Sequence, residues 1–143
     1  MSDTSQNLKN VKVGDRLPDL VKPPIDRTQL VRYTGASGDF NRIHFEEDFA
    51  RGAGYPSVIA HGMLSMAFLG ELVSSWGGGP AAVRKLKARF KAVTYPGDVV
   101  TCRGEVTAVR EEAGARVAEV KLWAETKPGT ITVEGSATVV VPA

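Results

Sequence analysis

The sequence predicts an α+β fold in which one long, apolar helix is wrapped by an antiparallel sheet. Three observations lead to this prediction. Residues 1–83 read as loops and helices with one strongly apolar run, and residues 84–143 read as strands joined by tight turns. A length of 143 residues is typical of one domain, and the sequence contains no internal repeat or linker. We therefore expect a single domain over residues 1–143.

Local signals place two short helices in the first half. Asp26 precedes Gln29 by three residues, as in a capping box, so a helix should begin near Asp26 and end at Gly35 and Gly38. A second helix is expected over Glu46–Arg51, because its acidic first turn suits the helix dipole.

The longest predicted helix runs from Gly62 to Ser75. Apolar side chains cover nearly every face of it, which indicates a buried helix. Three glycines and Pro80 follow it and should end it.

The second half contains four runs rich in Val and Thr, separated by Gly-containing turns. The predicted strands are Lys85–Tyr95, Val99–Val109, Arg116–Glu125 and Thr130–Val141. Such spacing predicts an antiparallel meander, and a sheet of few strands favours a homodimer that continues the sheet.

Composition narrows the possible partners and chemistry. The net charge is +2 and the chain is 43% hydrophobic and 24% charged, so we expect no nucleic-acid or membrane partner. The single cysteine, Cys102, excludes an internal disulfide and lies in a strand-like run, where a packed thiol is favoured over a nucleophile. The first ten residues are polar and no run of about 18 apolar residues exists, so a cytoplasmic protein is expected.

Both histidines lie within eighteen residues of each other, beside other polar side chains. Asp39, Asn41 and His44 fall in one glycine-punctuated loop, where a carboxylate and an imidazole could converge on a water molecule as an acid–base pair. Asn41 could lock the loop. The alternative is an ordinary turn in which Asp39 caps backbone amides.

The run Ala60–Met63 opens the long helix. An amide at this end has no intrahelical acceptor, and Gly62 allows a ligand to approach the backbone, so the Gly62 amide could bind an oxygen that becomes an enolate. In the alternative, Gly62 only relieves crowding and His61 caps or packs.

A basic strand segment follows. Lys85, Lys87, Arg89 and Lys91 alternate with apolar residues, and residues 84–91 hold five cations and no acid. The rest of the chain has a net charge of −3. Either this is a solvated strand face, or it binds the phosphates of coenzyme A or an acidic carrier protein.

Three motifs together resemble one known family. They are Tyr33-x-G-x-S-G-D-x-N-x-I-His44, the A-H-G-M run at Ala60–Met63, and R-F-K-A-V-x-Y-P-G-D at Arg89–Asp98. The chain is similar to MaoC-like (R)-specific enoyl-thioester hydratases, including (3R)-hydroxyacyl-carrier-protein dehydratases, from the first helix to the last strand.

The resemblance implies a hot-dog fold, dimers, and reversible hydration of a trans-2-enoyl thioester to a (3R)-3-hydroxyacyl thioester, without a metal or other cofactor. Asp39 and His44 would activate the water, the Gly62 amide would polarise the thioester carbonyl, and Asn41 would support the loop. The expected substrate-binding residues are Ala60, His61, Met63, Met66, Lys85 and Lys87.

Two positions depart from the family pattern. Arg42 stands where many members have proline, and Gly70 stands where some have a serine on the central helix. Competing hypotheses are a thioesterase of the same fold and a non-catalytic acyl-binding subunit, and a heterodimer with a second hot-dog subunit is an alternative to the homodimer.

Overall fold

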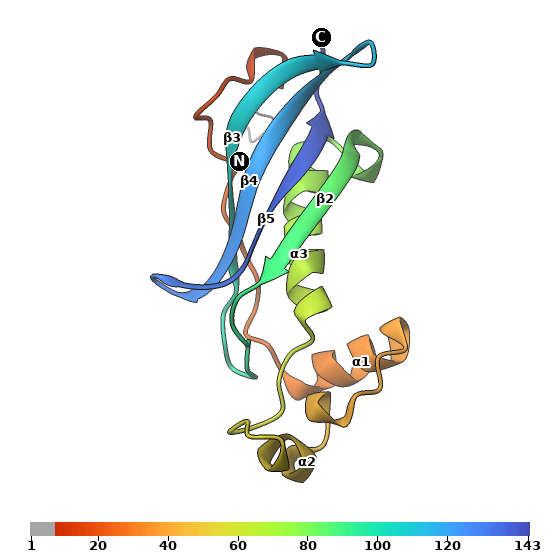
Figure 1. The fold of residues 1–143 in the computed structure, drawn as a ribbon, viewed down its shortest axis with the longest axis vertical. Coiled ribbons are helices and arrows are strands. Elements are labelled where there is room, and N and C mark those ends of the chain that lie inside the picture. Colours follow the sequence, from red (N-terminus) through yellow and green to blue (C-terminus); the bar gives the residue numbers. More distant parts are fainter. Residues whose placement is uncertain (1–7) are drawn as a thin grey trace.

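A computed structural model describes residues 8–143; residues 1–7, most of the polar stretch that argued against a signal peptide, lie outside it. Figure 1 shows a long helix lying against one face of a curved sheet, with two shorter helices beyond its N-terminal end. The helices are α1 (Arg27–Ser37), α2 (Glu47–Gly52) and α3 (Gly62–Trp76), and the strands are β1 (Leu20–Val21), β2 (Val83–Phe90), β3 (Thr101–Glu112), β4 (Ala115–Lys127) and β5 (Thr130–Val140). Three short 3₁₀ turns are η1 (Leu8–Asn10), η2 (Arg42–His44) and η3 (Pro80–Ala82). No helix in the described range is long and apolar enough to cross a membrane.

The sheet has the order β1-β3-β4-β5-β2, and every neighbouring pair is antiparallel. The predicted meander is therefore confirmed for β3, β4 and β5 and wrong for β2, which pairs with β5 rather than with β3. The connection between β2 and β3 is not a hairpin: the Ala60 amide donates to the Thr94 carbonyl over 2.8 Å, and the Gly97 amide donates to the Ile25 carbonyl over 2.7 Å. The Lys91 and Ala92 amides still donate to the Thr132 carbonyl of β5, and beyond them these bonds take the chain off the sheet, so β2 ends earlier than Tyr95.

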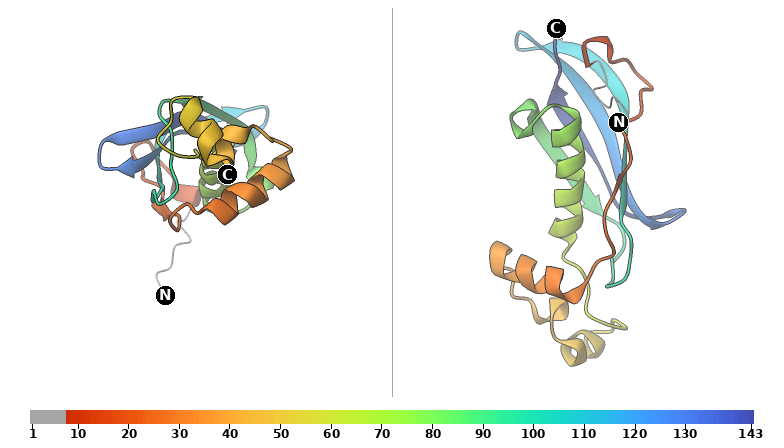
Figure 2. Two further views of the ribbon diagram at one scale, coloured as in Figure 1. Left: turned by 90° about the horizontal axis from the view of Figure 1, so that it is seen from below. Right: turned by 180° about the vertical axis from the view of Figure 1, so that it is seen from behind.

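The first half of the chain covers the opposite edge. Figure 2 shows the N-terminal segment running beside the sheet and α3 before it reaches α1. Its Leu17 amide donates to the Gly104 carbonyl, and its Lys22 amide donates to the Val100 carbonyl. The short strand β1, which the sequence did not predict, protects the β3 edge and leaves β2 as the exposed edge of the sheet.

The helix boundaries follow their local signals closely. The Asp26 carboxylate accepts from the Gln29 amide over 2.7 Å at the start of α1, and Gly38, with φ of 73°, ends it. Gly35 lies inside α1, so the prediction that it helps to end the helix is wrong.

The core lies between α3 and the concave face of the sheet. Leu69 and Val73 of α3 are fully buried there, and Cys102 on β3 is fully buried too. Burial raises the pKa of the Cys102 thiol to about 12, as expected for a packed thiol.

One face of α3 is not covered. Met63 is 54% exposed and Ala67 is also exposed, so the prediction of a helix buried on every side is wrong for the single chain. The physical reason is that one curved sheet covers only one side of a helix. Beside this face, Leu86 and Ala88 of β2 are half-buried and Phe90 is 50% exposed, although the alternation predicted a core position for Phe90.

Candidate active site

Local side-chain bonds shape the loop that follows α1. The Ser37 hydroxyl accepts from the Asp39 amide, Asp39 Oδ1 accepts from the Asn41 amide, and Asn41 Oδ1 accepts from the Ile43 amide, each over 3.2 Å. These are the turn contacts that Ser, Asp and Asn commonly make. They use only one carboxylate oxygen of Asp39, so the turn interpretation leaves the other oxygen free for chemistry.

That second oxygen faces His44. Asp39 Oδ2 lies 3.6 Å from His44 Nε2, and the Asp39 side chain is 49% exposed whereas that of His44 is 8% exposed. His44 Nδ1 lies 2.8 Å from the Ile59 carbonyl oxygen. Because a carbonyl only accepts, Nδ1 carries the hydrogen, and Nε2 of the neutral ring offers a lone pair. A water molecule, with two O–H donors, satisfies the carboxylate and this nitrogen together.

His61 packs against His44 and does not cap α3. The two rings are stacked, with centroids 3.7 Å apart and planes 21° apart, and the Tyr33 ring lies 4.7 Å from His61 on another side. His61 Nε2 lies 3.2 Å from the Thr34 hydroxyl, and within residues 8–143 Nδ1 has no hydrogen-bond partner. Burial, and secondarily the nearby His44, lowers the pKa of His61, which favours the neutral ring.

Three side chains of this site could also offer atoms to a metal ion. Asp39, His44 and His61 each offer one ligand atom, and these atoms lie within 4.8 Å of one another. The two imidazole rings are stacked with planes 21° apart, so the lone pairs of their nitrogens lie in nearly parallel planes, whereas zinc requires ligands that converge tetrahedrally. The arrangement fits an acid–base pair with a packed neighbour better than a metal site.

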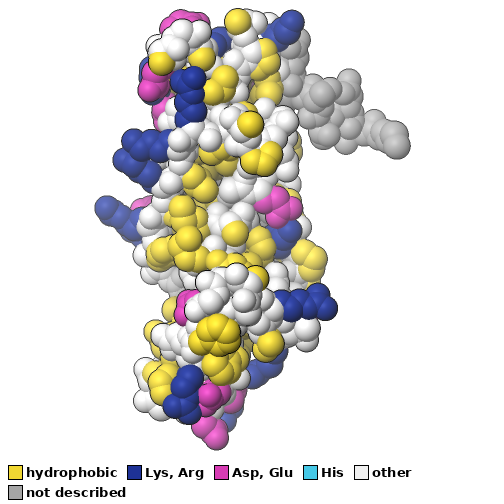
Figure 3. Space-filling model, turned by 90° about the vertical axis from the view of Figure 1, so that its right-hand side faces the viewer, with side chains coloured by type: hydrophobic (Ala, Val, Ile, Leu, Met, Phe, Trp, Pro, Cys, Tyr) yellow, Lys and Arg dark blue, Asp and Glu magenta, His cyan; other side chains and the backbone are white. Residues whose placement is uncertain are grey.

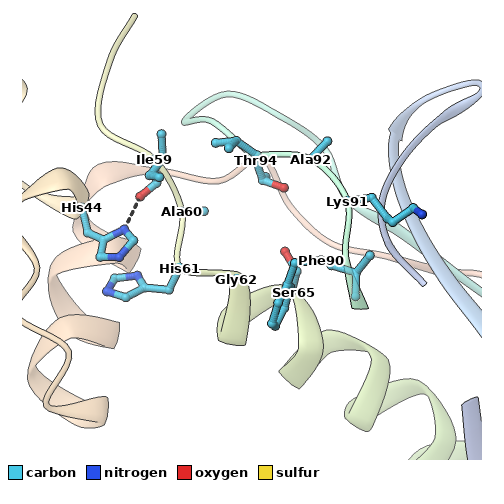
Figure 4. Close-up of a pocket in the computed structure, with 12 residues that line it drawn as sticks. His44, Ile59, Ala60, His61, Gly62, Ser65, Phe90, Lys91, Ala92 and Thr94 are labelled. Carbon is cyan, nitrogen blue, oxygen red and sulfur yellow. Dashed lines mark hydrogen bonds between the residues drawn. The ribbon is translucent and has the colours of Figure 1, made fainter. Parts of the chain in front are cut away.

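A cavity of about 300 Å³ opens between the start of α3 and the chain that follows β2 (Figure 4). The residues that line it are His44, Ile59, Ala60, His61, Gly62, Ser65, Phe90, Lys91, Ala92, Val93, Thr94 and Val133. Gly62 is the first residue of α3, where backbone amides carry the positive end of the helix dipole. A Cβ on Gly62 would lie 3.1 Å from the Phe90 ring, so glycine keeps this wall open.

The cavity gathers some of the predicted residues and not others. His44, Ala60, His61 and Gly62 line it, Asp39 reaches it through His44, and Asn41 holds the loop. The side chains of Met63 and Met66 are not part of its wall.

Lys85 and Lys87 line a different hollow on the sheet, together with Arg110, Glu112 and Glu119. The roles predicted for them as substrate-binding residues stay predictions.

Sequence reasoning missed eight of the twelve residues that line the cavity, among them Ser65, Phe90 and Thr94. Ser65 stands one turn after Gly62, and this spacing could have revealed it. Phe90 and Thr94 carried no such signal, because both lie within the predicted strand Lys85–Tyr95.

Arg42 stands where the resemblance leads us to expect a proline, and its side chain is bound on two sides. Its guanidinium donates to Glu46 over 2.8 and 2.6 Å and lies over the Phe49 ring, 4.5 Å from its centroid. This places the side chain against α2, where it ties the His44 turn to that helix.

Known proteins resemble this chain in sequence and in fold. The family model described as the MaoC-like domain matches residues 9–127. An (R)-specific enoyl-CoA hydratase of Rhodospirillum rubrum is 33% identical over 120 residues, which cover 83% of this chain and 81% of that protein. The solved (R)-hydratase from A. caviae, involved in PHA biosynthesis, has a TM-score of 0.83 at 28% identity and covers 94% of this chain and 99% of that one. The ChsH1–ChsH2 complex from Mycobacterium tuberculosis contains a chain with a TM-score of 0.80 at 25% identity, over 92% and 99%.

Proposed function

The chain belongs to the MaoC-like domain family, and from this premise we propose that it adds water reversibly to a trans-2-enoyl thioester, giving a (3R)-3-hydroxyacyl thioester. It is a hydro-lyase with a hot-dog fold, and coenzyme A is the carrier that its relatives' names indicate. The observation that carries the proposal is the Asp39 carboxylate facing His44 Nε2 over 3.6 Å, beside the amide end of α3.

The first step uses the acid–base pair. A water held between Asp39 and His44 attacks C3 of the enoyl group as one of its protons passes to the pair. The hydrogen bond that His44 Nδ1 donates to the Ile59 carbonyl keeps Nε2 as the nitrogen that can accept this proton. The electrons of the C2–C3 double bond move toward the thioester oxygen. C2 then takes a proton from the Asp39–His44 acid–base pair.

The start of α3 stabilises the charge that develops. The Gly62 amide and the positive end of the helix dipole lie beside the cavity, and a preorganised donor of this kind is worth most when the oxygen is anionic. Gly62 lacks a side chain that would keep the oxygen away.

A second copy of the chain is the proposed partner of the uncovered face. β2 is the exposed edge of the sheet, and hydrophobic side chains run down the face that carries α3 and β2 (Figure 3). Met63 at 54% and Phe90 at 50% exposure belong to it. Pairing of two β2 edges would continue the sheet and cover these side chains. Light scattering on the purified protein should give the mass of a dimer; a monomer that becomes active only with a second hot-dog subunit would indicate a heterodimer instead.

The acid–base assignment is tested by two variants and a matched control. Asp39→Asn and His44→Gln should each lower kcat for hydration of crotonyl-CoA by about 10²-fold or more while the protein stays folded. Asp48→Asn makes the same change of charge on an exposed position of α2 and should leave kcat unchanged. Near-wild-type turnover in both Asp39→Asn and His44→Gln would rule out the assignment.

A further inference from the structure

Two buried hydroxyls on the cavity wall have no role in the reaction described so far. Ser65 and Thr94 are each 4% exposed, and both line the cavity. Figure 4 marks no hydrogen bond from either hydroxyl to the other residues drawn. Figure 4 shows their oxygen atoms turned toward the space between them. Neither oxygen is among the enclosed side-chain atoms that lack a partner in the described residues, so both open into the cavity, where a polar atom of a ligand can bind them.

The position of Ser65 on α3 identifies that atom. Ser65 follows Gly62 by three residues, so both stand on the same side of the helix, one turn apart. Side chains on a helix lean toward its N-terminus, which carries the Ser65 hydroxyl over the turn that Gly62 begins. An oxygen bound by the Gly62 amide therefore lies within reach of this hydroxyl.

We propose that the Ser65 hydroxyl is a second hydrogen-bond donor to the thioester oxygen, beside the Gly62 amide, and that the Thr94 hydroxyl faces the same oxygen from across the cavity. This inference rests on the proposed hydratase function and adds a catalytic residue to it. An apolar acyl tail in this place would leave both hydroxyls unpaired, whereas an enolate oxygen accepts several donors. Because the oxygen gains charge in the transition state, these donors act mainly on kcat.

The test compares variants of Ser65 in the hydration of crotonyl-CoA. Ser65→Ala should lower kcat by about 10²-fold with little change in KM, as the loss of one oxyanion donor does in other enzymes. Ser65→Thr keeps a hydroxyl and should recover most of the loss. Ser74→Ala makes the same substitution further along α3, away from the cavity wall, and should behave as wild type.

Thr94→Val provides a second test that does not alter α3, and it should also lower kcat. Wild-type kcat in both Ser65→Ala and Thr94→Val, or a rise of KM alone, would overturn the inference. If those variants are active while Asp39→Asn is inactive, the hydratase function stands and only the inference fails. If wild-type protein does not hydrate the substrate at all, the proposed function itself fails.

Discussion

A methyl group on Gly62 should remove most of the activity and leave the protein folded. In Gly62→Ala the new Cβ would lie 3.1 Å from Cδ1 and Cε1 of Phe90, a contact that requires the ring to move by a few tenths of an ångström. In the single chain Phe90 is 50% exposed, so its ring can move there at a cost of about 0.5–1.5 kcal/mol for a strained rotamer. Alanine gains up to about 1 kcal/mol over glycine in a helix, so the free energy of unfolding should change by less than about 1 kcal/mol.

The effect on catalysis should be much larger than the effect on stability. The methyl group, and the ring it displaces, stand beside the Gly62 amide, where the proposed mechanism places the thioester oxygen. Loss of one such donor corresponds to about 10²–10³ in kcat, or about 2.7–4 kcal/mol. For each variant, an assay of crotonyl-CoA hydration gives kcat and a separate thermal melt gives the change in stability.

Gly35→Ala is the matched control. Gly35 also lies inside a helix, and a Cβ there meets nothing within 4 Å, so the variant should gain about 0.5–1 kcal/mol of stability with unchanged kcat. Wild-type kcat in Gly62→Ala would refute the close approach of substrate to this amide.

Three further predictions concern stability and reactivity. Gly135→Ala should strongly lower the melting temperature, because its Cβ would overlap the Lys87 carbonyl oxygen where β5 pairs with β2; a melt equal to wild type would contradict that register. Burial lowers the pKa of His61 below its ordinary 6.5, so near this pH the unfolded chain binds a proton that the folded chain does not, and stability should fall as pH drops below about 6.5. Between about pH 7.5 and pH 5.5 the melting temperature should therefore fall more with pH for wild type than for His61→Gln. Parallel curves would contradict this. The Cys102 thiol, with a pKa of about 12, should resist a thiol reagent at about pH 8 in the folded protein and react after denaturation; rapid native labelling would count against its burial.

Much of the fold could be predicted because its signals are local. The Asp26 cap, the apolar run of α3 and the turns between β3, β4 and β5 each depend on residues close together in the chain. The pairing of β2 with β5 could not be predicted in this way. It depends on the connection after Phe90 crossing to the far edge, and on a glycine at position 135 that no alternation pattern marks.

The residues of the candidate site also divide into those with local signals in the sequence and those brought in by long-range contacts. Asp39, Asn41 and His44 share one loop, so their spacing alone indicated that they could act together. Thr94 enters the cavity from a segment that the strand pattern had assigned to the sheet, and its contact with the Ala60 amide links residues far apart in sequence. The exposed face of α3 could not be predicted either, because an all-apolar helix has the same sequence pattern whether a sheet or a second copy covers it.

The most direct test of the account is the fate of crotonyl-CoA incubated with the wild-type protein. The account predicts loss of the enoyl absorbance without release of free thiol, and a product that is (3R)-3-hydroxybutyryl-CoA. Release of free thiol would show hydrolysis by a thioesterase, and a (3S) product or no reaction by the folded protein would equally contradict the proposed roles of Asp39, His44 and Gly62.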